Sequence, residues 1–331
     1  MTKISINSSS GTVEAQIHIT DLNKFLQCPR KFYYSNVERI QRARDTHGQI
    51  PGTTLGTMGH AGLHAHFGKT EVGPFDSFLM TGEELGVKLS DDEYVFWRNL
   101  FQRYEKHWGA DDAGMEILEI EYPIEIELIP GVKLLMTMDM IVKKHGRLWV
   151  WDHKFYKKRT SQDSLMLDPQ MSAYIWALRK EGKYKVSGAI YDVIIKKEPR
   201  KPDVLKSGKL SKAKDLVTDY DTYMKAIMEN QLDPKEYWDY LDMLKAREED
   251  SSFFQRIIVA RSPIENTNFQ KDLTYKVQSL IGCGRDMDRY FPNEADHCSY
   301  CEYLPLCKAR MEGADMSCIL PMYKEKLEGQ R

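Results

Sequence analysis

The sequence has no marked excess of charge of either sign and no long apolar run. Lys and Arg number 47 against 49 Asp and Glu among 331 residues, so the net charge of −2 gives no indication of a nucleic-acid partner. No apolar run approaches the roughly 20 residues of a membrane-spanning helix, and we expect no membrane partner. The first residues, Met1 to Gly11, are polar and rich in serine, unlike a secretory signal, which predicts a cytoplasmic location.

The chain also lacks the signatures of motor and repeat proteins. It contains no Gly-x4-Gly-Lys-Ser/Thr phosphate loop, so no ATP-driven motor is encoded, and it contains no internal repeat or heptad series. A length of 331 residues fits two domains or one elaborated α/β domain.

Four of the six cysteines lie at the two ends of the chain. The spacing Cys298-x2-Cys301-x5-Cys307 is typical of a soft-metal site, because a short turn aims two thiolates at one centre and the longer gap brings a third. Cys28 is the best fourth ligand, since it lies in a compact apolar and basic run from Phe25 to Tyr34. The sequence therefore predicts one metal centre that joins the two ends of the chain.

The identity of that centre has alternatives. Iron–sulfur is favoured, structural zinc is the second interpretation, and reduced thiols without metal are the third. Disulfides fit poorly with a cytoplasmic chain that has metal-type spacing, and Cys283 and Cys318 are left without an expected partner.

A local excess of positive charge occurs in residues 196–214. Eight Lys or Arg residues stand there against Glu198 and Asp203. Such a loop can neutralise several phosphates and indicates DNA contact, although a solvated loop has the same composition.

The hydrophobic patterns predict a helix, then strands, then further helices. An aromatic stripe at three- and four-residue intervals over residues 90–108 is typical of an amphipathic helix. Apolar runs predict strands at residues 117–129, 132–143, 147–156, 186–195 and 253–260. Further helices are expected from Asp168-Pro169 through Leu178, around residues 218–248, and before the cysteines.

Acidic and basic side chains on these strands indicate a metal-dependent hydrolytic site. Strand alternation places Asp152 and Lys154 on one face, and Asp139 lies on the preceding strand. Carboxylates brought together across a hairpin repel one another, and a hard divalent ion such as Mg2+ relieves that repulsion. The lysine beside the ion can orient a water molecule and meet the charge of a phosphate. By itself this pattern also occurs on ordinary strands with exposed charges.

Three other residues are candidates for the same site. Gly56-Thr57-Met58-Gly59-His60 predicts a helix that carries a histidine into the core, and Gln170 and Tyr174 lie four residues apart on one helix face. His64 and His66 compete with His60 for any role. A zinc pair of His60 and His64 is a weaker alternative because no glutamate base lies between them.

The ordered set of motifs resembles the PD-(D/E)xK nuclease superfamily, and within it the RecB-like branch, whose exonucleases carry a four-cysteine iron–sulfur cluster. The matching elements, in the family's order, are Cys28-Pro29-Arg30-Lys31-Phe32, Gly56 to His60, Asp139, Asp152 with Lys154, Gln170 with Tyr174, and Cys298-x2-Cys301-x5-Cys307. The resemblance covers residues 18–310, and Met136 stands where the family often has glycine. CRISPR-associated and phage-encoded exonucleases belong to this branch.

The resemblance implies a restriction-endonuclease-like α/β core with a central mixed sheet flanked by helices. This core is expected over residues 18–280, with a helical insertion and the basic loop 196–214. Residues 1–17 are expected to be flexible. Residues 281–331 are expected to form a cysteine region that Cys28 completes, joining the N- and C-terminal segments through a 4Fe-4S cluster.

The implied activity is Mg2+- or Mn2+-dependent hydrolysis of DNA by an exonuclease acting on single-stranded ends in recombination, repair or replication. A helicase or recombination protein is an expected partner, because any unwinding needs one. The alternatives are a DNA-binding adaptor iron–sulfur protein with vestigial nuclease activity and an iron–sulfur electron carrier.

The resemblance also implies roles for individual residues. Asp139 and Asp152 would hold the ion, with the His153 backbone carbonyl, and Lys154 would position the water. His60 would be a further metal ligand or act near the leaving group. Gln170 and Tyr174 would hold the lysine or the substrate strand, and Glu119 or Glu121 would also reach the metal.

Overall fold

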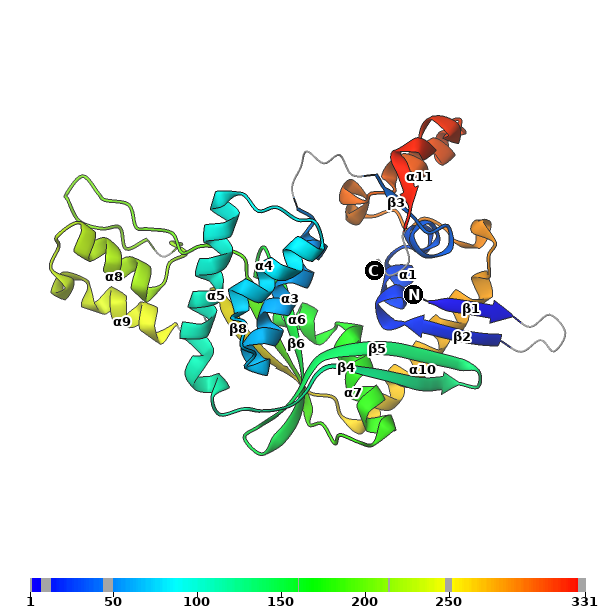
Figure 1. Ribbon diagram of the computed structural model, residues 1–331, viewed down its shortest axis with the longest axis horizontal. Coiled ribbons are helices and arrows are strands. Elements are labelled where there is room, and N and C mark those ends of the chain that lie inside the picture. Colours follow the sequence, from blue (N-terminus) through cyan, green and yellow to red (C-terminus); the bar gives the residue numbers. More distant parts are fainter. Residues whose placement is uncertain are drawn as a thin grey trace.

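A mixed sheet forms the centre of the protein in the computed structural model, which describes residues 2–6, 13–43, 50–159, 161–213, 215–247 and 252–326. Its seven strands run in the order β1-β2-β5-β6-β7-β8, with β4 paired to β5 (Figure 1). The strands are β1 (Lys3–Ile6), β2 (Val13–His18), β4 (Glu116–Ile129), β5 (Val132–Lys144), β6 (Arg147–Tyr156), β7 (Gly188–Ile195) and β8 (Phe254–Val259). The β2–β5 and β6–β7 pairs are parallel and the others antiparallel, which confirms the expected mixed sheet.

Helices cover both faces of this sheet. One face packs against α1, α7 and α10 around a core that includes Val150 and Tyr191, and the other packs against α3, α4 and α5 around Met140 and Trp151. The helices are α1 (Ile19–Gln27), α3 (Gly52–Gly68), α4 (Pro74–Glu84), α5 (Asp91–Asp112), α6 (Gln162–Met166), α7 (Pro169–Glu181) and α10 (Pro263–Cys283). None of the helices in the described ranges is both long and apolar enough to cross a membrane.

The helix starts follow from local sequence. Ser90 and Glu93 form a reciprocal capping box at the start of α5, and Ser262 and Glu265 form another at α10. Asp168 accepts a hydrogen bond from the backbone N–H of Gln170, which caps α7 as the Asp-Pro pair predicts. The helices and strands expected over residues 90–195 are thereby confirmed within a few residues of their ends.

The expected flexible start, residues 1–17, is wrong for its described part. Strands β1 and β2 pair with each other in antiparallel register, and β2 continues the central sheet by pairing with the first residues of β5. The apolar residues Ala15 and Ile17 are buried in the core, so this segment gains more from packing than a solvated start would.

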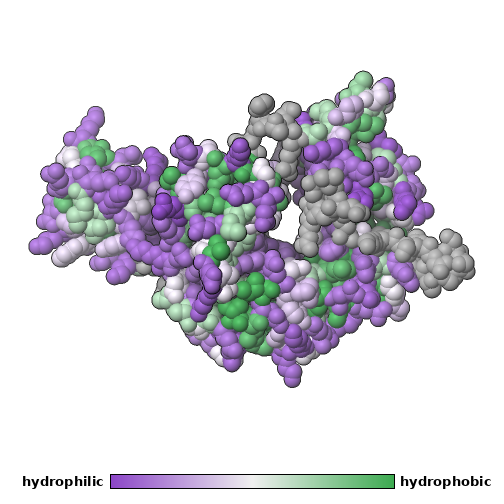
Figure 2. Space-filling model, in the orientation of Figure 1, coloured by the Kyte–Doolittle hydropathy of each residue, from purple (hydrophilic) through white to green (hydrophobic). Residues whose placement is uncertain are grey.

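A helical insertion separates β7 from β8, as expected for this part of the chain. It contains α8 (Tyr220–Glu229), the short turn η2 (Pro234–Tyr237) and α9 (Trp238–Ala246). Its own small core includes Tyr223, Ile227 and Leu241. The insertion extends at one end of the molecule (Figure 1), and hydrophilic side chains cover much of its surface (Figure 2).

The C-terminal region joins the N-terminal segment through several backbone contacts. Strands β3 (Ile40–Arg42) and β9 (Tyr323–Glu325) form a two-stranded sheet. Arg30 donates to the Tyr290 carbonyl at 2.5 Å, and Tyr303 donates to the Ile40 carbonyl at 2.7 Å. The remaining short elements are α2 (Pro29–Phe32), the π-turn η1 (Tyr33–Val37), η3 (Met287–Arg289), η4 (Asp296–Tyr300), α11 (Leu304–Glu312), η5 (Met316–Cys318) and η6 (Leu320–Met322).

Candidate active site

The centre of β5 lies at a fork in the sheet. One edge of β5 pairs with β4, while its other edge pairs with β2 near its start and with β6 near its end. Between these two stretches no described strand pairs with that edge of β5. Hydrogen bonds that involve side chains are made there in place of strand pairing. The Tyr174 hydroxyl donates to the Thr137 carbonyl at 2.9 Å, and the His153 backbone N–H donates to Asp139 Oδ2 at 2.8 Å. The fork therefore gives the Asp139 carboxylate a place inside the fold.

Side-chain direction along β5 also changes at Asp139. In a regular strand Met138 and Met140 would share a face. Here Met138 packs in the core of α1, α7 and α10, whereas Met140 packs in the core of α3, α4 and α5. Glu121, opposite Asp139 on β4, has a left-handed φ of 51°. Because of this local twist, the Asp139 side chain faces helix α3 and belongs to neither of the two apolar faces of the sheet.

Asp152 and Lys154 share one face of β6, as alternation predicts. Lys154 Nζ lies 2.8 Å from Asp152 Oδ2 and donates to Gln170 Oε1 at 3.0 Å. The Gln170 amide donates to Asp152 Oδ1 at 3.3 Å and to the Tyr174 hydroxyl at 2.6 Å. Helix α7 thus fixes the carboxylate and the ammonium group through Gln170, whose amide is braced by Tyr174.

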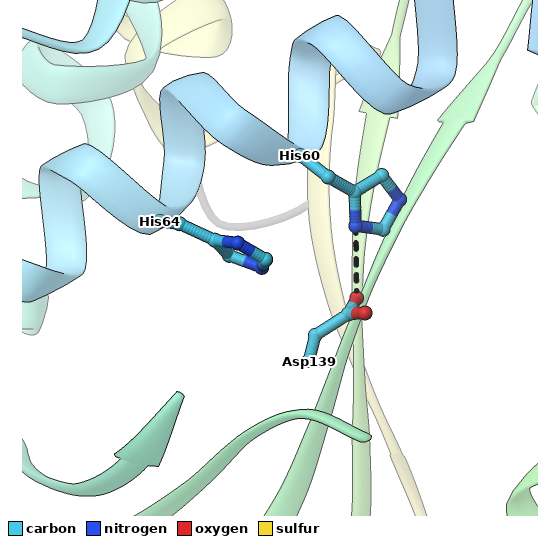
Figure 3. Close-up of side chains that lie close together, drawn as sticks. All are labelled: His60, His64 and Asp139. Carbon is cyan, nitrogen blue, oxygen red and sulfur yellow. Dashed lines mark ion pairs between the residues drawn. The ribbon is translucent and has the colours of Figure 1, made fainter. Parts of the chain in front are cut away.

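Helix α3 brings His60 against the fork because glycines allow it to approach closely. His60 Nδ1 lies 3.2 Å from Asp139 Oδ2 (Figure 3). A Cβ added at Gly59 would lie 2.7 Å from the Phe155 ring, and one at Gly62 would lie 2.4 Å from the Phe101 ring. The glycines at these two positions are therefore required for the distance between α3 and its neighbours.

The ligand atoms of His60, His64 and Asp139 lie within 4.8 Å of one another. These residues line a cavity of about 1020 Å³ between α3, α4 and the start of α1. Figure 2 shows the molecule hollowed between α3 and the part that carries the termini. Carboxylate and imidazole groups beside such a cavity fit a divalent ion that also contacts a substrate.

Burial and the neighbouring charges set the protonation of the site. Burial raises the pKa of Asp152 to about 6, despite the nearby Lys154 ammonium. Burial alone would also raise the pKa of Asp139, but the attraction and hydrogen bonds of His60 and His153 together lower it. Burial alone would lower the pKa of Lys154, but the attraction and hydrogen bond of Asp152, together with the attraction of Asp139, raise it. The metal-free site therefore holds Lys154 in its charged form.

The comparison with known families covers all of these residues. The profile of the PD-(D/E)XK nuclease superfamily matches residues 17–308. The chain belongs to the PD-(D/E)XK nuclease superfamily. Members of this superfamily usually use Mg2+ or Mn2+ and act on DNA, which agrees with the carboxylates at the fork.

Two other comparisons add less. A comparison of this chain with curated proteins found no match. A solved structure described as the crystal structure of SSO0001 is 13% identical, with 89% of this chain and 86% of that chain covered and a TM-score of 0.34. That similarity is too low to carry an argument about fold or function.

A buried polar network lies behind the site of this PD-(D/E)XK protein, and it was not expected from the sequence. The His153 side chain is fully buried, and its Nδ1 lies 2.9 Å from Asp192 Oδ2. The same carboxylate accepts a hydrogen bond from Tyr104, and Arg256 Nε lies 3.6 Å from its other oxygen. The signal in the sequence was Asp192, a single acidic residue within an otherwise apolar strand.

The sequence did not decide whether Glu119 or Glu121 lies near the metal site, and the structure places the two residues differently. Glu119 contacts Lys183 at 2.8 Å and Tyr184, away from the fork. Glu121 Oε1 lies 3.3 Å from His64 Nδ1 and lines the cavity beside Asp139. Of the two, only Glu121 lies beside the candidate metal ligands.

The four cysteines of the expected centre come from the two segments that pack together near the chain ends. The Asn293 backbone N–H donates to Cys28 Sγ at 3.5 Å, and Cys298 Sγ donates to the Asn293 carbonyl at 3.8 Å. Burial, reinforced by the neighbouring thiols, raises the pKa of Cys307 to about 11, and burial also raises the pKa of Cys301. Cys28 and Cys298 contribute to the raised pKa of both Cys301 and Cys307, so the four thiols lie near one another.

The two other cysteines are placed differently. Cys283 Sγ donates to the Ser279 carbonyl at 3.4 Å at the end of α10, and Cys318 is exposed. That these two cysteines are spare stays a prediction.

The basic loop of this superfamily member carries less free charge than its composition indicates. Lys201 contacts Glu229 on α8 at 2.9 Å, and Lys209 contacts Glu236 at 2.9 Å. Arg200 lies 3.6 Å from Asp203. Lys214, the last residue of the loop, lies outside the described residues. Part of the loop's positive charge thus stabilises the helical insertion.

Proposed function

We propose that the protein is a metal-dependent DNA exonuclease of the RecB-like branch, acting on single-stranded ends in recombination, repair or replication. The observation that carries the proposal is the meeting of Asp139, Asp152 and Lys154 at the fork of β5, with His60 against Asp139. An intact set of this kind favours an enzyme over a DNA-binding adaptor with vestigial activity, which has no need to keep a buried lysine and two carboxylates together.

Each residue has a role that follows from its contacts. Asp139, Asp152, His60 and the His153 carbonyl would hold Mg2+ or Mn2+. When bound, the ion stabilises charge on the phosphate and makes its water a better nucleophile. Lys154, charged because of Asp152, orients that water and meets the negative charge of the phosphate rather than serving as a free base.

Gln170 and Tyr174 act as positioning residues. Gln170 contacts both Asp152 and Lys154, and Tyr174 contacts Gln170 and the β5 backbone. A shift of α7 would therefore move the carboxylate and the lysine together. This coupling keeps the two groups in one geometry while the substrate binds.

We propose an iron–sulfur cluster at the four cysteines as the second cofactor. Four thiolates around one zinc ion stand about 3.8 Å apart, because each Zn–S bond is about 2.3 Å long. Within the described ranges no three of the sulfurs of Cys28, Cys298, Cys301 and Cys307 lie within 4.8 Å of one another. A four-iron cluster is larger than one ion and suits a wider set of thiols. Four iron atoms per chain with visible absorption would support the cluster, and one zinc atom would support the alternative.

The experiment for the activity uses single-stranded DNA labelled at the 5′ end or at the 3′ end. We expect mononucleotides or short products with Mg2+ or Mn2+, and none with chelator. The matched variant is Asp152→Asn, which keeps the size of the side chain but removes its charge. DNA binding without cleavage by the unaltered protein in every divalent ion would favour the adaptor, and cleavage retained in the variant would overturn the site.

A further inference from the structure

His64 has no role in the proposed reaction, yet it faces the same ion site. It lies one helical turn after His60 on α3, and the two ring centroids are 6.1 Å apart. Figure 3 shows both rings on the side of α3 that faces Asp139. The ligand atoms of the three residues lie within 4.8 Å of one another, and bonds of about 2.1 Å to one ion allow ligand separations of up to about 4.2 Å. A small movement of two side chains therefore suffices for a shared ion.

The contacts of His64 leave one ring nitrogen available. Nδ1 lies 3.3 Å from the Glu121 carboxylate, which assigns the proton to that nitrogen. Nε2 is buried and has no hydrogen-bond partner within the part of the chain that the structure describes. A carboxylate behind one nitrogen and a free lone pair on the other are typical of a metal-ligating histidine. A buried nitrogen without a partner also costs free energy, which a bound ion would recover.

The strained residue on β4 supports the same interpretation. Glu121 has a left-handed φ of 51°, which is unfavourable for a residue with a side chain. This conformation occurs opposite Asp139 and places the carboxylate against His64. The strained backbone of Glu121 thus accompanies the contact that orients the His64 imidazole.

The surrounding cavity gives the ion a function. Its described lining contains hydroxyl groups from Thr53, Thr57 and Thr81 and three acidic residues, Glu84, Glu121 and Asp139, but no lysine or arginine. Apart from a protonated histidine, the lining itself offers a phosphate no positive side chain, and Lys154 lies outside this lining. A bound ion would supply the missing positive charge.

We propose that His64 is a further metal ligand, and that His60, His64 and Asp139 together bind a transition ion such as Mn2+ in preference to Mg2+. Mg2+ favours oxygen ligands and water, whereas imidazole nitrogens favour first-row transition ions. Two imidazoles in one site with the Asp139 and Asp152 carboxylates therefore favour a transition ion over Mg2+. This inference rests on the proposed function, because it names the ion of that same site.

The test measures ion binding directly, without DNA. Mn2+ is titrated into the full chain and the free ion is followed by electron paramagnetic resonance, with Mg2+ as competitor. In His64→Asn we expect the Mn2+ affinity to fall about tenfold or more while the Mg2+ affinity changes less than about threefold. The matched control is His145→Asn, on the exposed turn between β5 and β6, where asparagine tolerates the φ of 50°.

The possible results separate this inference from the nuclease proposal. His64→Gln is a second variant in case His64→Asn does not fold, as judged by circular dichroism. Unchanged Mn2+ and Mg2+ affinities in a folded His64 variant overturn the role of His64, and cleavage of single-stranded DNA by that variant leaves the nuclease proposal intact. Failure of the unaltered protein to bind Mn2+ also overturns the inference. Cleavage of DNA by the unaltered protein with Mg2+ would still support the nuclease proposal in that case.

Discussion

The fork of β5 and the cysteine region are held together in different ways. At the fork, Asp152 is 1% exposed and His153 and Asp192 are 0% exposed, between two helical layers and inside a continuous sheet. The cysteine region consists of short turns and the nine-residue helix α11, and Tyr300 beside the ligands is 79% exposed. The first region is positioned inside the sheet by packing and buried hydrogen bonds. The second combines exposed turns with a buried aromatic base that includes Tyr290 and Tyr303, each 0% exposed.

This difference teaches what a metal centre contributes in each place. At the fork the ligands are already oriented by Gln170, by the His153 backbone and by α3, so an ion there adds chemistry more than structure. At the cysteines a centre would close a loop of 270 residues between Cys28 and Cys298 and so contribute to the fold itself.

The largest expected effect tests the structural side of this comparison. Cys28→Ala removes the only thiol of the set that comes from the N-terminal segment, so the crosslink is lost. We expect the free energy of unfolding to fall by about 5 kcal/mol, from the lost restriction of the unfolded chain, with loss of visible absorption. Denaturant unfolding measures the change, and Cys318→Ala is the control. A coloured and equally stable Cys28→Ala protein would remove Cys28 from the centre.

The next effect concerns activity at the fork. Lys154→Ala removes the cation that meets the phosphate charge, and we expect kcat for single-stranded DNA to fall about 10³-fold. The visible absorption should change little, because the cysteine region does not depend on this side chain. Lys158→Ala, at an exposed position shortly after β6, is the control. Cleavage within tenfold of the unaltered rate would contradict the role of Lys154.

A smaller effect tests whether packing positions the fork. Gly62→Ala places a Cβ 2.4 Å from the Phe101 ring and 2.8 Å from the Pro74 carbonyl, and the backbone cannot yield easily. We expect a loss of about 3 kcal/mol in the free energy of unfolding. Gly56→Ala on the same helix meets open space and should be neutral or stabilising by up to about 1 kcal/mol. Equal stabilities of the two variants would show that α3 has room to move.

The smallest expected effect concerns the buried network behind the site. Tyr104→Phe removes the hydroxyl that donates to Asp192, and we expect a loss of about 2 kcal/mol, as is usual for a hydrogen bond to a buried charge. Tyr94→Phe, on the exposed side of the same helix, should change stability by less than about 0.5 kcal/mol. Thermal unfolding compares the two variants, and equal melting temperatures would argue against a structural role of the network.

Much of the local structure could be predicted because it depends on neighbouring residues. Apolar runs located β4, β5 and β6, and strand alternation placed Asp152 and Lys154 on one face. The Asp-Pro pair located the start of α7, and the i, i+4 spacing placed Gln170 beside Tyr174. Charge composition was a weaker guide, since the basic loop pairs with glutamates that lie 27 and 28 residues further on.

The sequence by itself predicted the candidate residues of the site and determined on which helix or strand each one lies, because periodicity and capping act over a few residues. Only the tertiary structure decided that β5 forks, that Asp139 faces α3, and that Glu121 rather than Glu119 lies beside the site. The pairing of the N-terminal strands and the contact between His153 and Asp192 were also decided by the tertiary structure. These features depend on contacts between segments far apart in the chain, where sheet twist and close packing, not local pattern, set the distances.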